Sequence, residues 1–143
     1  MAKSADQRLL RFRWVSDQST TVAELESVAE ALRNAGADAE IEEAKGFFDL
    51  GISVLIVGAM AVVSLAGTIL SFVKDIQHGG LIIDGTRNPP MIREDRSLDR
   101  GVVIFIPRQG DKIVLGASHR GDSGEILEKL ERSVLLEKLM SLL

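Results

Sequence analysis

One short stretch of the chain carries the residue types of nucleophilic catalysis. Residues 118–125 read SHRGDSGE and place Ser123 directly after Asp122, with His119 four residues before the serine. A serine oxygen becomes a nucleophile when a histidine base and a buried aspartate are held in line with it. The same letters also fit a helix start, because Asp122 or Ser123 can accept free backbone amides, and Glu125 follows Asp122 at capping-box spacing. We expect the helix cap.

The letters Gly-Asp-Ser-Gly within this stretch are similar to the nucleophile turn of trypsin-like serine proteases. Those enzymes bring histidine and aspartate to the serine with a double-barrel fold, which needs a considerably longer chain. His78 and His119 are the only histidines, and the sequence has no cysteine. We therefore expect no catalytic residue, no cofactor or cofactor-binding residue and no metal site, and we predict that the protein is not an enzyme.

Length and charge narrow the class of protein further. A chain of 143 residues has room for one domain, or for one small domain and a membrane segment. Its 17 basic and 21 acidic residues give a net charge of −4, so nucleic acid is not expected as a partner, because that partner requires a basic face. The lack of cysteine excludes a disulfide framework and fits a reducing compartment. The opening residues, MAKSADQRLLRFRW, lack the apolar core of a secretory signal.

Residues 1–46 are predicted to form a βαβ unit. Apolar and basic residues alternate over Leu10–Trp14, which is typical of a half-buried strand, and apolar residues recur at helical spacing from Val22 to Leu32. A second alternating stretch, ADAEIEEA at residues 37–44, predicts another strand. If the two strands pair in parallel across the helix, opposite charges meet on their outer faces. The residues concerned are Arg11, Arg13, Glu40 and Glu42.

The rest of the chain after the apolar segment is predicted to hold strands and a charged loop over residues 75–121 and a C-terminal helix over residues 122–143. A strand begins at residues 81–83, a charged loop covers residues 86–101, and VVIFIPRQGDKIVLGA reads as a hairpin. Its first strand is apolar at every position from Val102 to Ile106, which predicts a central strand covered on both faces. We expect segments 1–46 and 75–143 to form one α+β domain.

The charged loop is rich in arginine. It offers either a partner surface or a site of proteolytic cleavage, since exposed basic loops are accessible to proteases, and an ordinary charged connection is the alternative. The residues are Arg87, Arg93, Arg96 and Arg100.

Residues 47–74 are predicted to form one apolar helix. Within them, residues 50–73 read LGISVLIVGAMAVVSLAGTILSFV, without a single charge. A helix of 24 residues is about 36 Å long, enough to cross a hydrocarbon core of about 30 Å. Cationic and aromatic residues flank the segment, as expected of anchors at the two membrane interfaces. These anchors are Lys45, Phe47, Phe48, Phe72 and Lys74.

Small residues and a methionine follow one stripe of this helix at alternating three- and four-residue steps, which predicts helix packing and self-association. The stripe holds Ser53, Met60, Ser64, Gly67 and Ser71. A bend near Gly58 or Gly67 would give a re-entrant hairpin in the membrane instead. A single crossing would divide the strands between two sides of a bilayer, so the alternative is a soluble, cytoplasmic homo-oligomer in which the helix forms the assembly core.

Three segments together resemble the effector-associated constant component proteins of bacterial conflict systems. They read AELESVAEALRNAG, DLGISVLIVGAMAVVSLAGTILSFVKD and VVIFIPRQGDKIVLGA, and the resemblance lies in the order of their elements. It implies a non-catalytic partner of a variable effector, often a trypsin-like or caspase-like protease. It carries over no functional residues.

These observations together predict a non-catalytic, membrane-associated and self-associating α+β protein that acts as an effector or anchors one in bacterial defence. The alternative is a soluble homo-oligomeric scaffold or adaptor built on the same helix.

Overall fold

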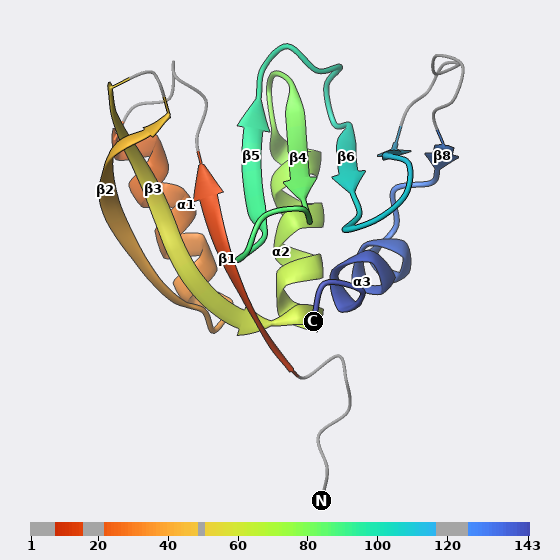
Figure 1. Ribbon diagram of the computed structural model, residues 1–143, viewed down its shortest axis with the longest axis horizontal. Helices are drawn as coiled ribbons and strands as arrows, with labels where there is room; N and C mark the ends of the chain where they lie inside the picture. The colour runs from red at the N-terminus through yellow and green to blue at the C-terminus, as the bar shows by residue number, and fades with distance from the viewer. Residues whose placement is uncertain (1–7, 16–21, 49–50, 117–125) are drawn as a thin grey trace, which may run out of the picture.

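The protein folds around one mixed sheet. The computed structural model describes residues 8–15, 22–48, 51–116 and 126–143, of which 22, 43–48, 51–54 and 126–128 are described by their backbone alone. The described elements are β1 (Leu9–Val15), α1 (Val22–Asn34), β2 (Asp38–Phe48), β3 (Gly51–Ala61), α2 (Val62–Asp75), β4 (Gly80–Asp84), β5 (Met91–Asp95), β6 (Val103–Ile106), β7 (Ile113–Leu115), β8 (Ile126–Glu128) and α3 (Arg132–Met140). The strands are ordered β2-β3-β1-β5-β4-β6-β7-β8 (Figure 1).

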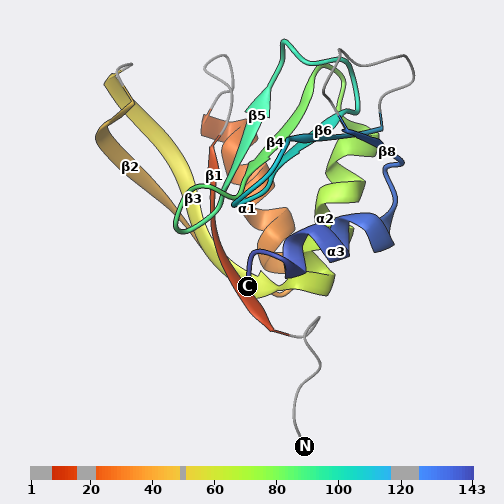
Figure 2. The ribbon, with the colours of Figure 1, turned by 45° about the vertical axis from the view of Figure 1, so that its right-hand side comes forward.

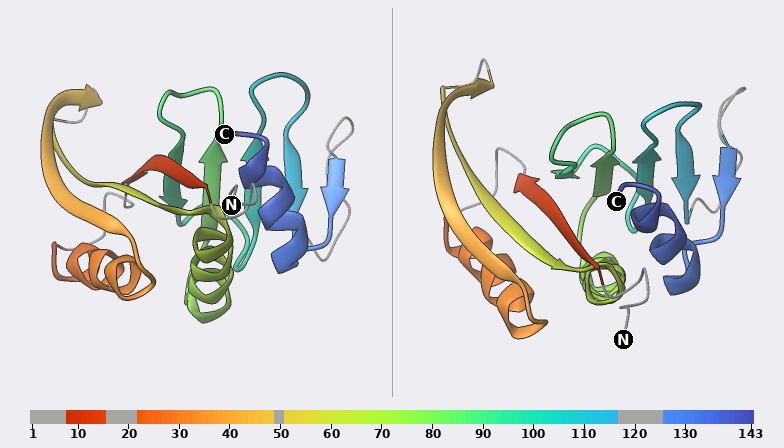
Figure 3. Two further views of the ribbon diagram at one scale, coloured as in Figure 1. Left: turned by 90° about the horizontal axis from the view of Figure 1, so that it is seen from below. Right: turned by 60° about the horizontal axis from the view of Figure 1, so that its bottom comes forward.

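The helices cover one face of this sheet. Figure 3 shows α1 and α2 on the same side of the strands, and α3 packs beside α2 over β6 and β7. One continuous core joins the inner residues of all three helices to alternate residues of the strands, among them Phe12, Trp14, Ile56, Ile83 and Phe105. Among the described residues, no charged side chain is buried. The opposite face of the sheet is turned toward the viewer in Figure 1.

The first strand and helix are confirmed at β1 and α1, but the predicted parallel pairing of the first two strands is wrong. β3 lies between β1 and β2 and is antiparallel to both, so the three form a ribbon that curves away from the other strands (Figure 2). Opposite Arg11 and Arg13 lie Ala59 and Val57 of β3, not the carboxylates of β2. The sequence pattern located the strands but held no information on the third strand between them.

The predicted helix over residues 47–74 is also wrong. Its first half is β3 and its second half is α2, and the chain changes from strand to helix at Ala61, whose backbone is extended. β3 is apolar at almost every position because the charges of the open face of the sheet stand on its two neighbours, β1 and β2. At Gly58 the backbone of β3 lies close to β2 and to the Phe12 ring of β1. A Cβ at this position would lie 2.9 Å from the Asp38 carbonyl oxygen and 3.0 Å from Phe12 Cζ.

The prediction that this segment spans a membrane depended on the long helix, and it is wrong because that helix does not form. The 14 residues of α2 make a rod of only about 21 Å, shorter than the hydrocarbon core of a bilayer. In the parts of the chain that the structure describes, no helix combines the length and the apolar character that a crossing needs. The predicted transmembrane helix, and the membrane association that rested on it, are therefore corrected.

The region after α2 is richer in strands than predicted. β4 and the β6–β7 hairpin match the prediction, but the supposed charged loop contains β5, which pairs with β4 and with β1. β6 lies inside the sheet, yet only Val103 and Phe105 point toward the helices, while Ile104 and Ile106 remain half-buried on the other face. The expectation that this strand is covered on both faces is wrong.

The C-terminal helix is shorter than predicted. Residues 126–128 form strand β8 beside β7, and the helix itself begins only at Arg132. Leu135, Leu139 and Leu142 fix the last segment to the core. The proposed cap at Asp122 or Ser123 lies outside the described residues.

Candidate functional site

A groove runs between α1 and α2 on the helical side of the sheet. We call it the α1/α2 groove; its volume is about 770 Å³, within the range of ordinary ligand sites. It exists because α1 and α2 each pack on the sheet and make few contacts with each other. The lining comprises Trp14, Val28, Ala31, Asn34, Ala35, Ser64, Gly67, Thr68, Ser71, Phe72, Asp75, Ile76 and Arg132.

Two aromatic rings form the floor of the groove. Trp14 of β1 and Phe72 of α2 meet edge to face, with ring centroids 5.2 Å apart and planes at 83°. This geometry is the preferred one for aromatic pairs. The Trp14 indole Nε1 donates a hydrogen bond of 3.0 Å to Oε2 of Glu94 on β5, so the buried ring keeps a satisfied donor. The floor is therefore apolar, with the Glu94 carboxylate at its margin.

The walls of the groove are formed by small residues. Ala31 stands on α1, Ala35 directly follows its last residue, and Ser64, Gly67 and Ser71 stand on α2. Small side chains allow another backbone to approach closely. The Arg132 guanidinium of α3 lies across α2 at Gly67, 3.9 Å from where a Cβ would be, which is an ordinary contact distance.

A second hollow of about 510 Å³ shares Val28, Phe72 and Ile76 with the groove. Its lining is more acidic and includes Glu24, Glu94 and Asp95, together with His78 and Arg96. Arg96 Nη2 contacts Glu24 Oε2 at 3.4 Å. The two hollows follow α2 from a basic end near Arg132 to an acidic end beside β5.

The predicted small-residue stripe divides at the junction of strand and helix. Its α2 members, Ser64, Gly67 and Ser71, line the groove together, whereas Ser53 and the buried Met60 lie in β3. Gly58, the predicted bend position, also lies within β3. The sequence pattern did not single out Trp14 or Arg132 as part of a site. Trp14 reads as one core residue of a strand, and only the fold brings Arg132 across Gly67.

The five predicted anchors also separate. Lys45, Phe47 and Phe48 belong to β2, where the structure describes only the backbone. Phe72 is half-buried in the groove floor, and Lys74 is exposed near the end of α2. Because no long helix joins these residues, they do not mark the two ends of one apolar span.

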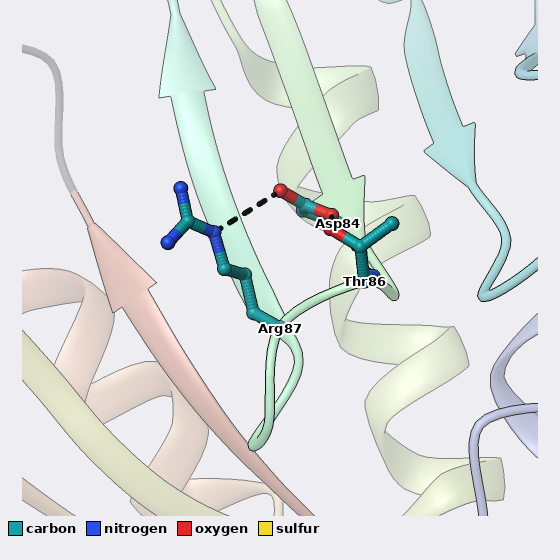
Figure 4. A network of polar contacts seen from close by, with 3 residues as sticks. All are labelled: Asp84, Thr86 and Arg87. Carbon is teal, nitrogen blue, oxygen red and sulfur yellow. Dashed lines mark hydrogen bonds and ion pairs between the residues drawn. The ribbon is translucent and has the colours of Figure 1, made fainter.

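The four arginines of the predicted loop do not form one surface. Arg87 contacts Asp84 at 3.6 Å in the β4–β5 turn, where Thr86 N also donates to that carboxylate at 3.0 Å (Figure 4). Arg93 is exposed on β5, and Arg100 Nε donates to the Ile76 carbonyl oxygen at 3.0 Å. Arg96 contacts Glu24 of α1. Arg87, Arg96 and Arg100 thus each bind a different partner within the chain.

The stretch that carries the residue types of nucleophilic catalysis is not among the described residues. Ser123, His119 and Asp122 lie outside the described residues, and His78 is exposed in the connection that follows α2. The described residues contain no group of three metal-binding side chains. Comparison of the chain with protein-family models, with curated proteins and with solved structures gave no match.

Proposed function

We propose that the protein is a non-catalytic adaptor that holds an amphipathic helix of a partner protein in the α1/α2 groove. The observation that carries this proposal is the position of Ser64, Gly67 and Ser71. A stripe typical of a helix-packing face lines a groove, and no helix of the described chain fills it. The axes of packed helices lie about 8–10 Å apart, and small residues at the contact allow the closest approach.

The dimensions and charges of the groove fit such an occupant. From Ser64 to Ile76 the groove follows about 18 Å of α2, which matches a helix of about 12 residues. Arg132 stands at one end, and Glu24, Glu94 and Asp95 stand toward the other. A helix with its C-terminus near Arg132 and its N-terminus near the carboxylates has a favourable dipole orientation. Acidic residues in its last turn and basic residues in its first turn would strengthen the contact through direct pairing with these groups.

The side of α2 that lines the α1/α2 groove is the side left for contact with another molecule. Val62, Leu65, Ala66, Ile69 and Val73 pack against the chain's own core, so the apolar half of the helix is already used. An assembly core built from the whole helix is therefore disfavoured, while docking along the groove keeps the fold intact. The resemblance to effector-associated constant components adds the suggestion that the partner helix belongs to an effector.

Titration with designed helical peptides tests the adaptor function. The probe is a peptide of about 14 residues with an alanine and leucine stripe, basic residues in its first turn and acidic residues in its last. Trp14 is the single tryptophan and lies in the groove floor, so its fluorescence reports binding directly. We expect saturable binding that weakens when the peptide's two charged ends are exchanged.

Two variants provide the matched control, and because each adds a second tryptophan, their peptide binding is measured by isothermal titration calorimetry. Ala31→Trp fills the groove from α1, where Ala31 is exposed, and should abolish peptide binding without unfolding the protein. Glu30→Trp places the same side chain one residue away, at a position outside the groove lining, and should bind the peptide normally. Equal binding by both variants would show that the groove is not the docking site.

A further inference from the structure

The face of the sheet opposite the helices carries its charges in separate columns. Asp38, Glu40 and Glu42 point outward along β2, and we call them the acidic column. Arg11 and Arg13 point outward along β1, and we call them the basic column. Between them, Leu55, Val57 and Ala59 of β3 form an apolar column.

The strand register aligns these columns row by row. One row reads Asp38, Ala59, Arg11 across the three strands, and the next reads Glu40, Val57, Arg13. Neighbouring strands lie about 4.8 Å apart, so each carboxylate and the guanidinium of its row belong to backbones about 10 Å apart. The two charged columns are therefore equally distant from β3, one on each side of it.

Nothing in the described chain neutralises the acidic column. Asp38, Glu40 and Glu42 are exposed, and no ion pair to any of them occurs among the described residues. Val57 and Ala59 are half-buried, and Val57 packs beside a small apolar cluster of Val15, Leu55 and Met91 that is separate from the main core. The surface thus combines apolar side chains with opposite charges in fixed positions.

We propose that a second copy of the chain packs face to face on this surface, related by a twofold axis that lies in the interface along β3. This rotation exchanges the two sides of β3, so the acidic column of each copy faces the basic column of the other. In the same rows, Asp38 meets Arg11 of the second copy, and Glu40 meets Arg13. Two sheets packed in this way lie about 10 Å apart with their strands nearly aligned.

The pattern selects a second copy over an unrelated protein because it is self-complementary. A twofold contact requires every patch to meet its own counterpart, and an acidic column and a basic column at equal distances from an axis satisfy this condition. Arg93 of β5 extends the basic side next to Val15. The surface is small beside the interfaces of obligate dimers, so the dimer is weak and dissociates as salt rises. This contact leaves the α1/α2 groove open on the opposite side of the sheet.

Charge reversal with recombination tests the dimer. The basic variant set is Arg11→Glu with Arg13→Glu, and the acidic set is Asp38→Arg with Glu40→Arg. Each full-length variant alone presents one sign of charge on both sides of β3 and should be monomeric in sedimentation velocity at concentrations where the native protein dimerises. An equimolar mixture should dimerise again, because every carboxylate of these two rows then faces an arginine in both halves of the contact.

Three outcomes would overturn the proposal. The native protein could remain monomeric at low salt and high concentration, the variants could dimerise as the native protein does, or the mixture could fail to recombine although both variants retain the native circular dichroism spectrum. Pairing of the two columns within one chain would instead give two destabilised monomers that do not recombine. Ala31→Trp should leave dimerisation unchanged, which separates this contact from the groove.

Discussion

The two faces of the sheet are built from the same strands and differ in composition residue by residue. Ile56 points toward the helices and is fully buried, whereas its neighbour Val57 points to the other face and is half-buried. The covered face is apolar across β2, β3 and β1, while the open face alternates acidic, apolar and basic columns. Strand alternation thus lets one segment serve the core with half of its residues and recognition with the other half.

This contrast also explains why an uncharged run can be misleading. Residues 55–61 contain no charge although one face of their strand is open, because the charges of the open face lie on the neighbouring strands. A central strand can lack charges altogether when β1 and β2 supply them on both sides. Solvation of the open face is therefore a property of three strands together and not of β3 alone.

Substitution of adjacent residues in β3 gives the largest expected effect and tests the contrast directly. Ile56→Ala leaves a cavity under α1 and should lower the free energy of unfolding by about 3 kcal/mol. Val57→Ala removes a half-buried side chain from the open face and should cost about 1 kcal/mol. Urea titration followed by Trp14 fluorescence measures both values. Equal losses of unfolding free energy would mean that the open face of the sheet is as well covered as the face under the helices.

Gly58 tests how closely the covered face is packed. Gly58→Ala places a Cβ 2.9 Å from the Asp38 carbonyl oxygen and 3.0 Å from Phe12 Cζ, so β2 or the ring must move, and we expect a loss of about 2 kcal/mol. The matched substitution on the open face, Ala59→Val, should change stability by less than about 0.5 kcal/mol. A tolerated Gly58→Ala would indicate that β2 lies farther from β3 at this point than the structure shows.

Glu94 links the core to the margin of the groove. Glu94→Leu leaves the Trp14 indole N–H without its acceptor and should cost about 2 kcal/mol, because an unsatisfied buried donor is expensive. Glu94→Gln retains an acceptor oxygen and should cost less than about 1 kcal/mol. Thermal unfolding compares the two variants. If both lose the same stability, the hydrogen bond to Trp14 is not the source of the effect.

Substitution of Gly67 gives the smallest expected change in stability, and this change is a gain instead of a loss. A Cβ at this position meets Arg132 only at 3.9 Å, so Gly67→Ala should fit and should stabilise the protein by about 0.5–1 kcal/mol through its helix propensity. A larger side chain, as in Gly67→Leu, should displace Arg132 and narrow the groove. Stability and peptide binding measured together distinguish these effects. A destabilised Gly67→Ala would show that the helix needs the glycine itself.

Local elements were predicted well where side-chain periodicity is strong. The alternation around Phe12 and the helical spacing around Leu25 identify β1 and α1 with nearly correct limits. The uncharged run failed because a central strand followed by a buried helix has no charged position at which one ends and the other begins. β5 was missed for the opposite reason, since its five residues include three charges and follow two prolines, which is typical of a loop.

The candidate site could be predicted only in part. The spacing of Ser64, Gly67 and Ser71 indicated a packing face, and these residues do line one groove together. Trp14 and Arg132 are more than one hundred residues apart in sequence, and each resembles an ordinary core or surface residue until the fold places it. Separation of this kind leaves no local pattern, because the contact depends on how distant elements pack.

The amino-acid sequence alone determined the absence of cysteine chemistry, the modest negative charge, the first strand and helix, and the apolar character of residues 50–73. Only the tertiary structure decided that this apolar run divides at Ala61, that β3 lies between β1 and β2, and that one face of the sheet carries aligned columns of opposite charge. Periodicity reports which side of an element is apolar. Strand order and register depend on contacts between residues far apart in the chain, so they appear only when the whole sheet has formed.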